Sequence, residues 1–137
     1  MPATTTHQAM IYLMVITSAS DRDMTDIELA RIGEVVRTWP VFEDFDAEKL
    51  VATAQKCEKL LHEEAGLDGV LVLARAAIPP RLRDTAYAAA FEVAAVDLEM
   101  RMEEVRVLDR LREALDLEDN VAFAIERAAK ARHRMLT

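Results

Sequence analysis

The spacing of its apolar residues limits the folds open to this chain more than any other feature. Apolar residues recur at intervals of three and four almost everywhere, and the alternation typical of β-strands is absent. Only three glycines and four prolines interrupt the 137 residues. We therefore expect an all-α fold. The expected helices cover about residues 5–20, 25–39, 46–65, 68–77, 80–96 and 101–115, and a seventh is capped by Asp119.

Two of the expected helices have no polar face and should lie at the centre of the fold. Residues 5–20 are apolar almost all round the helix, and residues 80–96 contain the alanine-rich stretch 86–95. A helix without a polar face is buried in a globular protein. A chain of this length can form a conventional core, so we expect a single domain over residues 1–137.

Local capping signals mark several helix ends. Thr25 and Glu28 have the spacing of a capping box, in which each side chain accepts a hydrogen bond from the other residue's backbone N–H group. Asp46 and Asp119 are further N-cap candidates, and Gly66 is placed to end a helix. These signals set the boundaries given above to within about two to four residues.

The charge balance is acidic, with 25 Asp and Glu residues against 17 Lys and Arg residues and a net charge of −8. This excess disfavours binding to nucleic acid and anionic lipid, and it favours cations or basic partners. The exception is a basic tail, which we interpret as favourable charge at the C-terminal end of a helix dipole, with its histidine in solvent. The tail comprises Arg127, Lys130, Arg132, His133 and Arg134.

Cysteine use and hydropathy predict a cytoplasmic protein that does not insert into a membrane. Cys57 is the only cysteine, so the chain has no internal disulfide, which suits a reducing compartment. The longest uncharged run, residues 8–20, is shorter than the roughly 20 apolar residues that span a bilayer.

An internal repeat is visible at an offset of 76 residues, where residues 18–32 align with residues 94–108. Both segments follow the pattern Asp, any residue, acid, Met, three residues of any kind, Glu. If whole helices are repeated, the first three correspond to the last three, and the fourth is a connector. We therefore expect a seven-helix bundle with internal duplication, with halves at about residues 5–65 and 80–135.

The repeated acids lie where a carboxylate is costly. Glu28 belongs to the apolar stripe of Ile32, and Glu104 belongs to that of Leu108. The other acids follow helix C-termini, where the helix dipole repels anions. A buried carboxylate must be paired or bind a metal, and ligand sets made only of oxygen atoms favour Ca²⁺, Mg²⁺ or Mn²⁺ over Zn²⁺. The candidate metal ligands are Asp21, Asp23, Glu28, Asp97, Glu99 and Glu104.

A structural role is the alternative interpretation of these acids. Glu28 occupies a capping position, and Arg22, Arg31 and Arg106 could neutralise the others through salt bridges. An EF-hand is not a good description, because the required glycine is missing and Ile32 occupies the final ligand position. Without a metal, the acidic turns would form a docking surface for a basic protein partner.

The acidic turn and the residues after it resemble the TerB tellurite-resistance family and the related domain at the start of DjlA-type co-chaperones. The resemblance covers most of the chain. It rests on three segments: the acidic turn Ala95–Glu99 with the following Glu104, the acidic turn Ala19–Asp23 with the following Glu28, and the ending Leu115–Leu117. Arg22 and Leu98 stand where the family usually has glycine. The resemblance implies a duplicated seven-helix bundle in the cytoplasm, associated with membrane-linked stress and tellurite-resistance systems, with metal binding suspected at the acids.

These observations predict a non-enzymatic, TerB-like protein that binds a divalent cation through its acidic turns and serves a metal or envelope-stress response. The interaction module without metal is the second hypothesis, and a hydrolase that uses two metal ions is the third. The protein partner implied by the resemblance is a membrane-associated stress complex. The sequence leaves open whether the two turns converge on one site.

Overall fold

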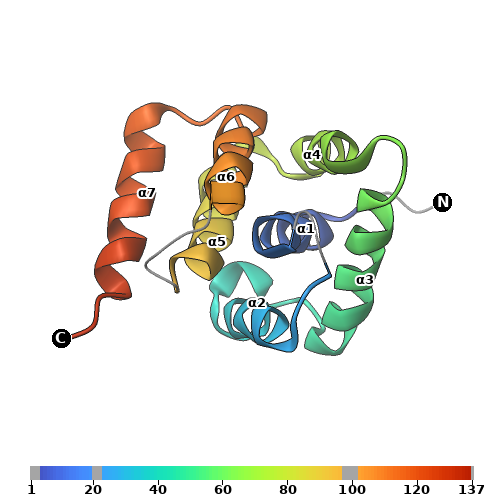
Figure 1. The fold of residues 1–137 in the computed structure, drawn as a ribbon, viewed down its shortest axis with the longest axis horizontal. Coiled ribbons are helices and arrows are strands. Elements are labelled where there is room, and N and C mark those ends of the chain that lie inside the picture. Colours follow the sequence, from blue (N-terminus) through green and yellow to red (C-terminus); the bar gives the residue numbers. More distant parts are fainter. Residues whose placement is uncertain (1–3, 20–22, 97–101, 137) are drawn as a thin grey trace.

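The computed structural model describes residues 4–19, 23–96 and 102–136, and these segments form helices without any strand. The prediction of an all-α, seven-helix bundle is confirmed, and Figure 1 shows its arrangement. The described α-helices are α1 (Thr6–Ala19), α2 (Asp26–Thr38), α3 (Leu50–Leu61), α4 (Gly66–Ala77), α5 (Arg83–Ala95), α6 (Met102–Ala114) and α7 (Asp119–Arg132). The short 3₁₀-helices are η1 (Pro40–Phe42), η2 (Ala47–Lys49) and η3 (Pro80–Leu82).

α1 lies at the centre of the bundle. All its side chains from Ala9 to Ala19 are buried, and it packs against α2, α3, α4, α5 and α6, which surround it in Figure 1. The sequence predicts this position, because the helix has no polar face to turn toward water. None of the helices that the structure describes is long and apolar enough to cross a membrane.

α5 is the second central helix, as its alanine-rich sequence predicts. Its residues from Ala86 to Ala95 are buried except for Ala88 and Glu92, which are partly exposed. α5 packs against α1 on one side and α7 on the other (Figure 1), and it also contacts α2 and α6. Small alanine side chains allow these neighbouring helices to approach closely.

The packing of the helices follows the order that an internal duplication would give. α1 contacts both α2 and α3, and α5 contacts both α6 and α7. α4 lies between the two sets in the chain and packs on α1, α3 and α6. The duplication itself stays a prediction, because a helical bundle without an internal repeat could pack in the same way.

Several helix ends differ from the sequence prediction. Asp46 caps the 3₁₀-helix η2, which leads into α3, and α3 ends at Leu61 rather than near residue 65. Gly66 begins α4 instead of ending α3, because its φ of 52° turns the chain between the two helices. Asp119 is the first residue of α7 and not its cap; its carboxylate instead accepts a hydrogen bond from Arg112 Nη2 at 2.8 Å.

Candidate functional site

The acidic segments lie between α1 and α2 and between α5 and α6. Of the six candidate ligands, the structure describes Asp23, Glu28 and Glu104. Asp23 precedes α2 and is exposed, whereas Glu28 and Glu104 are half-buried in the first turns of α2 and α6. The remaining candidates lie outside the described residues: Asp21, Asp97 and Glu99.

Glu28 forms the capping box that the sequence predicts. Its Oε1 atom accepts a hydrogen bond from the Thr25 backbone N–H at 2.9 Å, and Thr25 Oγ1 accepts one from the Glu28 N–H at 3.2 Å. The same helix face continues inward through Ile32 and Val35, which are both buried. The capping role of Glu28 is therefore confirmed, and this carboxylate has a structural function whether or not it binds an ion.

Glu104 occupies the corresponding position at the start of α6. The face on which it lies continues through Leu108 and Leu111, which are buried, and through Leu115 after the helix. Glu104 itself remains partly exposed. The inward-facing stripe predicted from the sequence is thus present in both α2 and α6, with a half-buried glutamate at its outer end.

The described residues do not form a metal centre among themselves. Within residues 4–19, 23–96 and 102–136, no three Asp, Glu, His or Cys side chains gather closely enough to hold an ion. A site at the two acidic segments would need Asp21, Asp97 or Glu99 in addition to the described acids. The oxygen-only donor set fits a hard divalent cation.

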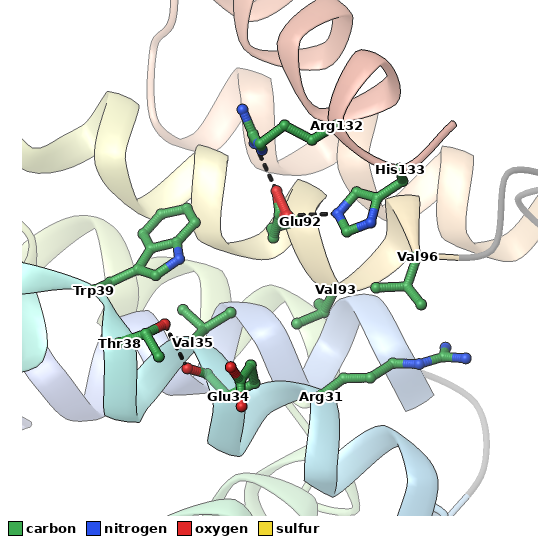
Figure 2. Close-up of a pocket in the computed structure, with 10 residues that line it drawn as sticks. All are labelled: Arg31, Glu34, Val35, Thr38, Trp39, Glu92, Val93, Val96, Arg132 and His133. Carbon is green, nitrogen blue, oxygen red and sulfur yellow. Dashed lines mark hydrogen bonds and ion pairs between the residues drawn. The ribbon is translucent and has the colours of Figure 1, made fainter. Parts of the chain in front are cut away.

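A hollow that the sequence did not predict lies between α2, α5 and the end of α7 (Figure 2). Its volume is about 350 Å³, and the valines Val35, Val93 and Val96 line it together with Trp39. Charged side chains stand around these apolar groups. They are Arg31, Glu34, Glu92, Arg132 and His133. Val96, which lines the hollow, is the last described residue before the second acidic segment.

Glu92 fastens the end of α7 to α5 at one side of this hollow. Arg132 Nη2 donates a hydrogen bond to Glu92 Oε1 at 2.6 Å, and His133 Nε2 donates one to Glu92 Oε2 at 2.5 Å (Figure 2). Burial opposes ionisation of Glu92, but the hydrogen bonds and charges of Arg132 and His133 outweigh it and lower the pKa of this carboxyl group.

The expectation that His133 lies in solvent is wrong. Its side chain is only 25% exposed, because the pairing with Glu92 draws it onto α5. The sequence held one signal for this contact: Glu92 is the only charged residue in α5 after Asp84. A charge on an otherwise buried helix needs a partner, and the basic tail of α7 was available to supply it.

The comparisons with known proteins identify a family for this chain. The sequence model of a family described as "Tellurite resistance protein TerB" matches residues 7–127, which is most of the chain. No curated protein and no solved structure matches. The matched region includes both acidic segments and every α-helix except part of α1 and of α7. The chain therefore belongs to the TerB tellurite-resistance family.

Proposed function

We propose that this TerB-family domain binds a divalent cation through the acids of its two inter-helix segments and serves a metal or envelope-stress response in the cytoplasm. The proposed ligands are drawn from Asp21, Asp23, Glu28, Asp97, Glu99 and Glu104. The observation that carries the proposal is the repeated acid pattern, together with the matched, half-buried positions of Glu28 and Glu104. The proposed role is binding rather than catalysis.

The electrostatics of the segments support a cation. The first begins after the C-terminus of α1 and the second after that of α5, so each meets the negative end of a helix dipole. Asp21 and Asp97 follow these helix ends in the sequence, where the dipole disfavours an anion, and a divalent cation would offset that cost. Because the donors are carboxylate oxygens, Ca²⁺, Mg²⁺ and Mn²⁺ suit them better than Zn²⁺.

The melting temperature of chelator-treated protein tests the proposal, measured alone and with millimolar Ca²⁺, Mg²⁺, Mn²⁺ or Zn²⁺. A ligand at a hundred times its Kd stabilises the folded state by about 2.7 kcal/mol. For a domain of this size that corresponds to an increase of about 5 to 15 °C. We expect such an increase with at least one of the three hard ions, and no increase with any of them would contradict the proposal.

Two conservative variants test whether the ion binds at the two acidic segments. Asp21→Asn and Asp97→Asn each remove a charge from one segment with almost no change in volume, and each should reduce the increase in melting temperature. Asp44→Asn is the matched control, because Asp44 is exposed in the turn after η1, beyond the C-terminal end of α2, whereas the first segment precedes the N-terminal end of that helix. If the ion raises the melting temperature equally in all three variants, the ion binds elsewhere.

The second candidate function is an interaction module without metal, in which the acidic segments form a docking surface for a basic partner. The capping box favours this possibility, since it gives Glu28 a role that needs no ion. The net charge of −8 would also attract a basic protein. A domain that shows no stabilisation by any ion, and whose charge-neutral variants fold normally, would favour this function.

A further inference from the structure

A groove runs between α6 and α7, two helices that both pack on α5 and touch each other little. A hollow of about 150 Å³ occupies this groove, with Tyr87 and Phe91 of α5 at its base and Val105 and Leu108 of α6 along one wall. Small-molecule sites usually have volumes of about 300–1,000 Å³, so this hollow suits one anchoring side chain better than a free ligand.

The apolar lining is accessible from outside at its rim on α6, whereas Tyr87, Phe91 and Leu108 beneath it are at most 4% exposed. Val105 is 39% exposed, and Met102 lies one turn earlier on α6 with 64% of its surface exposed. The rings of Tyr87 and Phe91 lie 6.1 Å apart between centroids, and Tyr87 is fixed by donating a hydrogen bond to Glu126 at 2.7 Å. This base is rigid, as a pocket for a partner's anchoring residue requires.

Acidic side chains dominate the end of the groove where α6 leads into α7. A second hollow of about 350 Å³ lies there and shares Asp109 and Arg112 with the first. Arg112 is already engaged, since its Nη2 atom lies 2.8 Å from Asp119 Oδ1 and its guanidinium lies 5.0 Å from the centre of the Phe123 ring. Among the residues that the structure describes, five carboxylates and two cations line the two hollows. The carboxylates are Asp109, Glu113, Asp116, Asp119 and Glu126, and the cations are Arg112 and Lys130.

We propose that the groove between α6 and α7 binds a basic amphipathic helix of a partner protein. One large apolar side chain of that helix packs on Val105 at the mouth of the hollow above Tyr87 and Phe91, and lysines or arginines flanking it face Asp109, Glu113 and Asp116. The choice of a basic partner follows from charge complementarity at the groove and from the net charge of the whole chain. The proposal is independent of cation binding at the inter-helix segments, because it uses different residues.

Binding of two synthetic helical peptides tests the proposal. Both have 14 residues with leucines on one face; the first has lysines at the remaining positions and the second has glutamates. Fluorescence anisotropy of labelled peptide against the full chain should show saturable binding of the lysine peptide only. Backbone amide NMR shifts should then change along α6, α7 and the middle of α5. Absence of binding, or shifts centred on other helices, would overturn the proposal.

Matched variants separate the groove from general attraction to an acidic protein. Asp109→Lys/Glu113→Lys should raise the Kd of the lysine peptide about five- to tenfold, because two attractions become repulsions. The control is Glu43→Lys/Asp44→Lys, which makes the same change in net charge at exposed positions near η1. An equal loss of affinity in the control would show that only net charge matters and would overturn the proposal.

The apolar contact has its own pair of variants. Val105→Glu should raise the Kd of the lysine peptide at least about tenfold, as expected for an anchoring position. Val51→Glu, at a similarly exposed valine on α3, should leave this Kd unchanged. Sedimentation of the peptide-free chain supplies a further readout. A concentration-dependent dimer that Val105→Glu abolishes would overturn the proposal in favour of a second copy of this chain as the occupant.

Discussion

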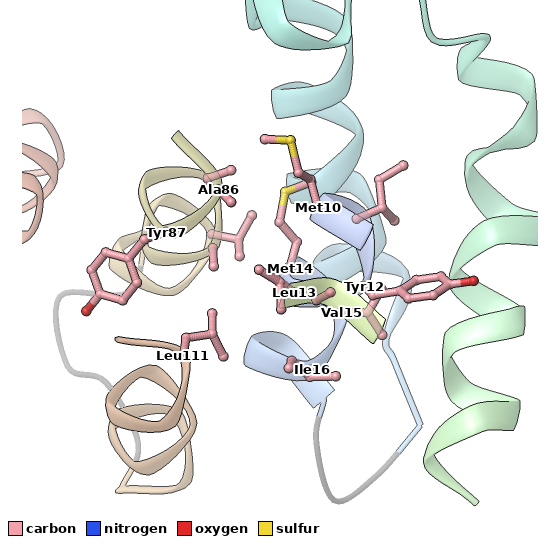
Figure 3. Close-up of a cluster of buried hydrophobic side chains, with 14 of the residues drawn as sticks. Met10, Tyr12, Leu13, Met14, Val15, Ile16, Ala86, Tyr87 and Leu111 are labelled. Atoms are coloured by element: carbon pink, nitrogen blue, oxygen red, sulfur yellow. The ribbon is translucent and has the colours of Figure 1, made fainter. Parts of the chain in front are cut away.

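Replacing Tyr12 by phenylalanine should stabilise the protein, which is the opposite of what most substitutions in a buried helix do. Tyr12 lies on α1 with none of its surface exposed, and its hydroxyl has no hydrogen-bond partner among the described residues. Burial raises the pKa of this hydroxyl, so it stays protonated at neutral pH and is an unsatisfied donor. Figure 3 shows its ring pointing away from Tyr87, the other tyrosine of the core.

The expected magnitude follows from the cost of an unsatisfied buried hydroxyl group, which is about 1–3 kcal/mol. Phenylalanine removes that cost but leaves a small space where the oxygen was. We therefore expect Tyr12→Phe to raise the free energy of unfolding by about 1 kcal/mol and the melting temperature by about 3–5 °C. Urea unfolding followed by far-UV circular dichroism measures the first quantity, and a thermal scan measures the second.

Tyr87→Phe is the matched control, because it removes the same atom from a hydroxyl that does have a partner. Tyr87 donates a hydrogen bond to Glu126 Oε2 at 2.7 Å, and hydrogen bonds to charged groups contribute about 1.5–3 kcal/mol. This variant should lose about 1–2 kcal/mol of stability. If Tyr12→Phe destabilises the protein as much as Tyr87→Phe does, the description of the Tyr12 environment is wrong.

Three further predictions concern a charge, a thiol and a cap. Glu92→Gln should lower stability at pH 7 by about 1–3 kcal/mol, because two charge-assisted hydrogen bonds are weakened. The folded-state pKa of Glu92 lies below its ordinary value of 4.5. The ionised carboxylate therefore stabilises the folded state fully above about pH 4.5, and this stabilisation disappears as the pH falls through the folded-state pKa. The difference in melting temperature between the wild-type protein and this variant should accordingly shrink between pH 5 and pH 3, and a constant difference would contradict the reasoning. Cys57 is fully buried and burial raises its pKa to about 12, so a thiol reagent should modify it only in urea; rapid labelling of the native protein would contradict this. Thr25→Ala should cost about 1 kcal/mol in urea unfolding by removing the capping box, whereas an unchanged midpoint would show that the box contributes nothing.

The architecture was largely predictable because it depends on periodicity. α1 and α5 were expected to be central because neither has a polar face, and both are buried. The box at Thr25 was predictable because capping depends only on neighbouring residues. Gly66 was misassigned because a glycine with positive φ can either end one helix or turn the chain into the next, and the sequence does not distinguish these uses.

The contacts between distant residues were not predictable in the same way. Glu92 and His133 are 41 positions apart, and only the packing of α7 on α5 brings them together. The groove between α6 and α7 likewise depends on how far two helices separate, which periodicity does not determine. The candidate acids were found from a local repeat that predicted inward-pointing carboxylates, and the structure places Glu28 and Glu104 half-buried at the outer ends of two buried stripes.

Addition of substoichiometric Mn²⁺ to isotope-labelled, chelator-treated protein tests the central proposal most directly, because this paramagnetic ion broadens the NMR signals of nearby amides. We expect selective broadening at residues 20–28 and 97–104, and its loss in Asp21→Asn/Asp97→Asn. Signals that remain sharp in these segments, or broadening centred on Asp109 to Asp119 at the α6–α7 groove, would contradict cation binding by the inter-helix acids.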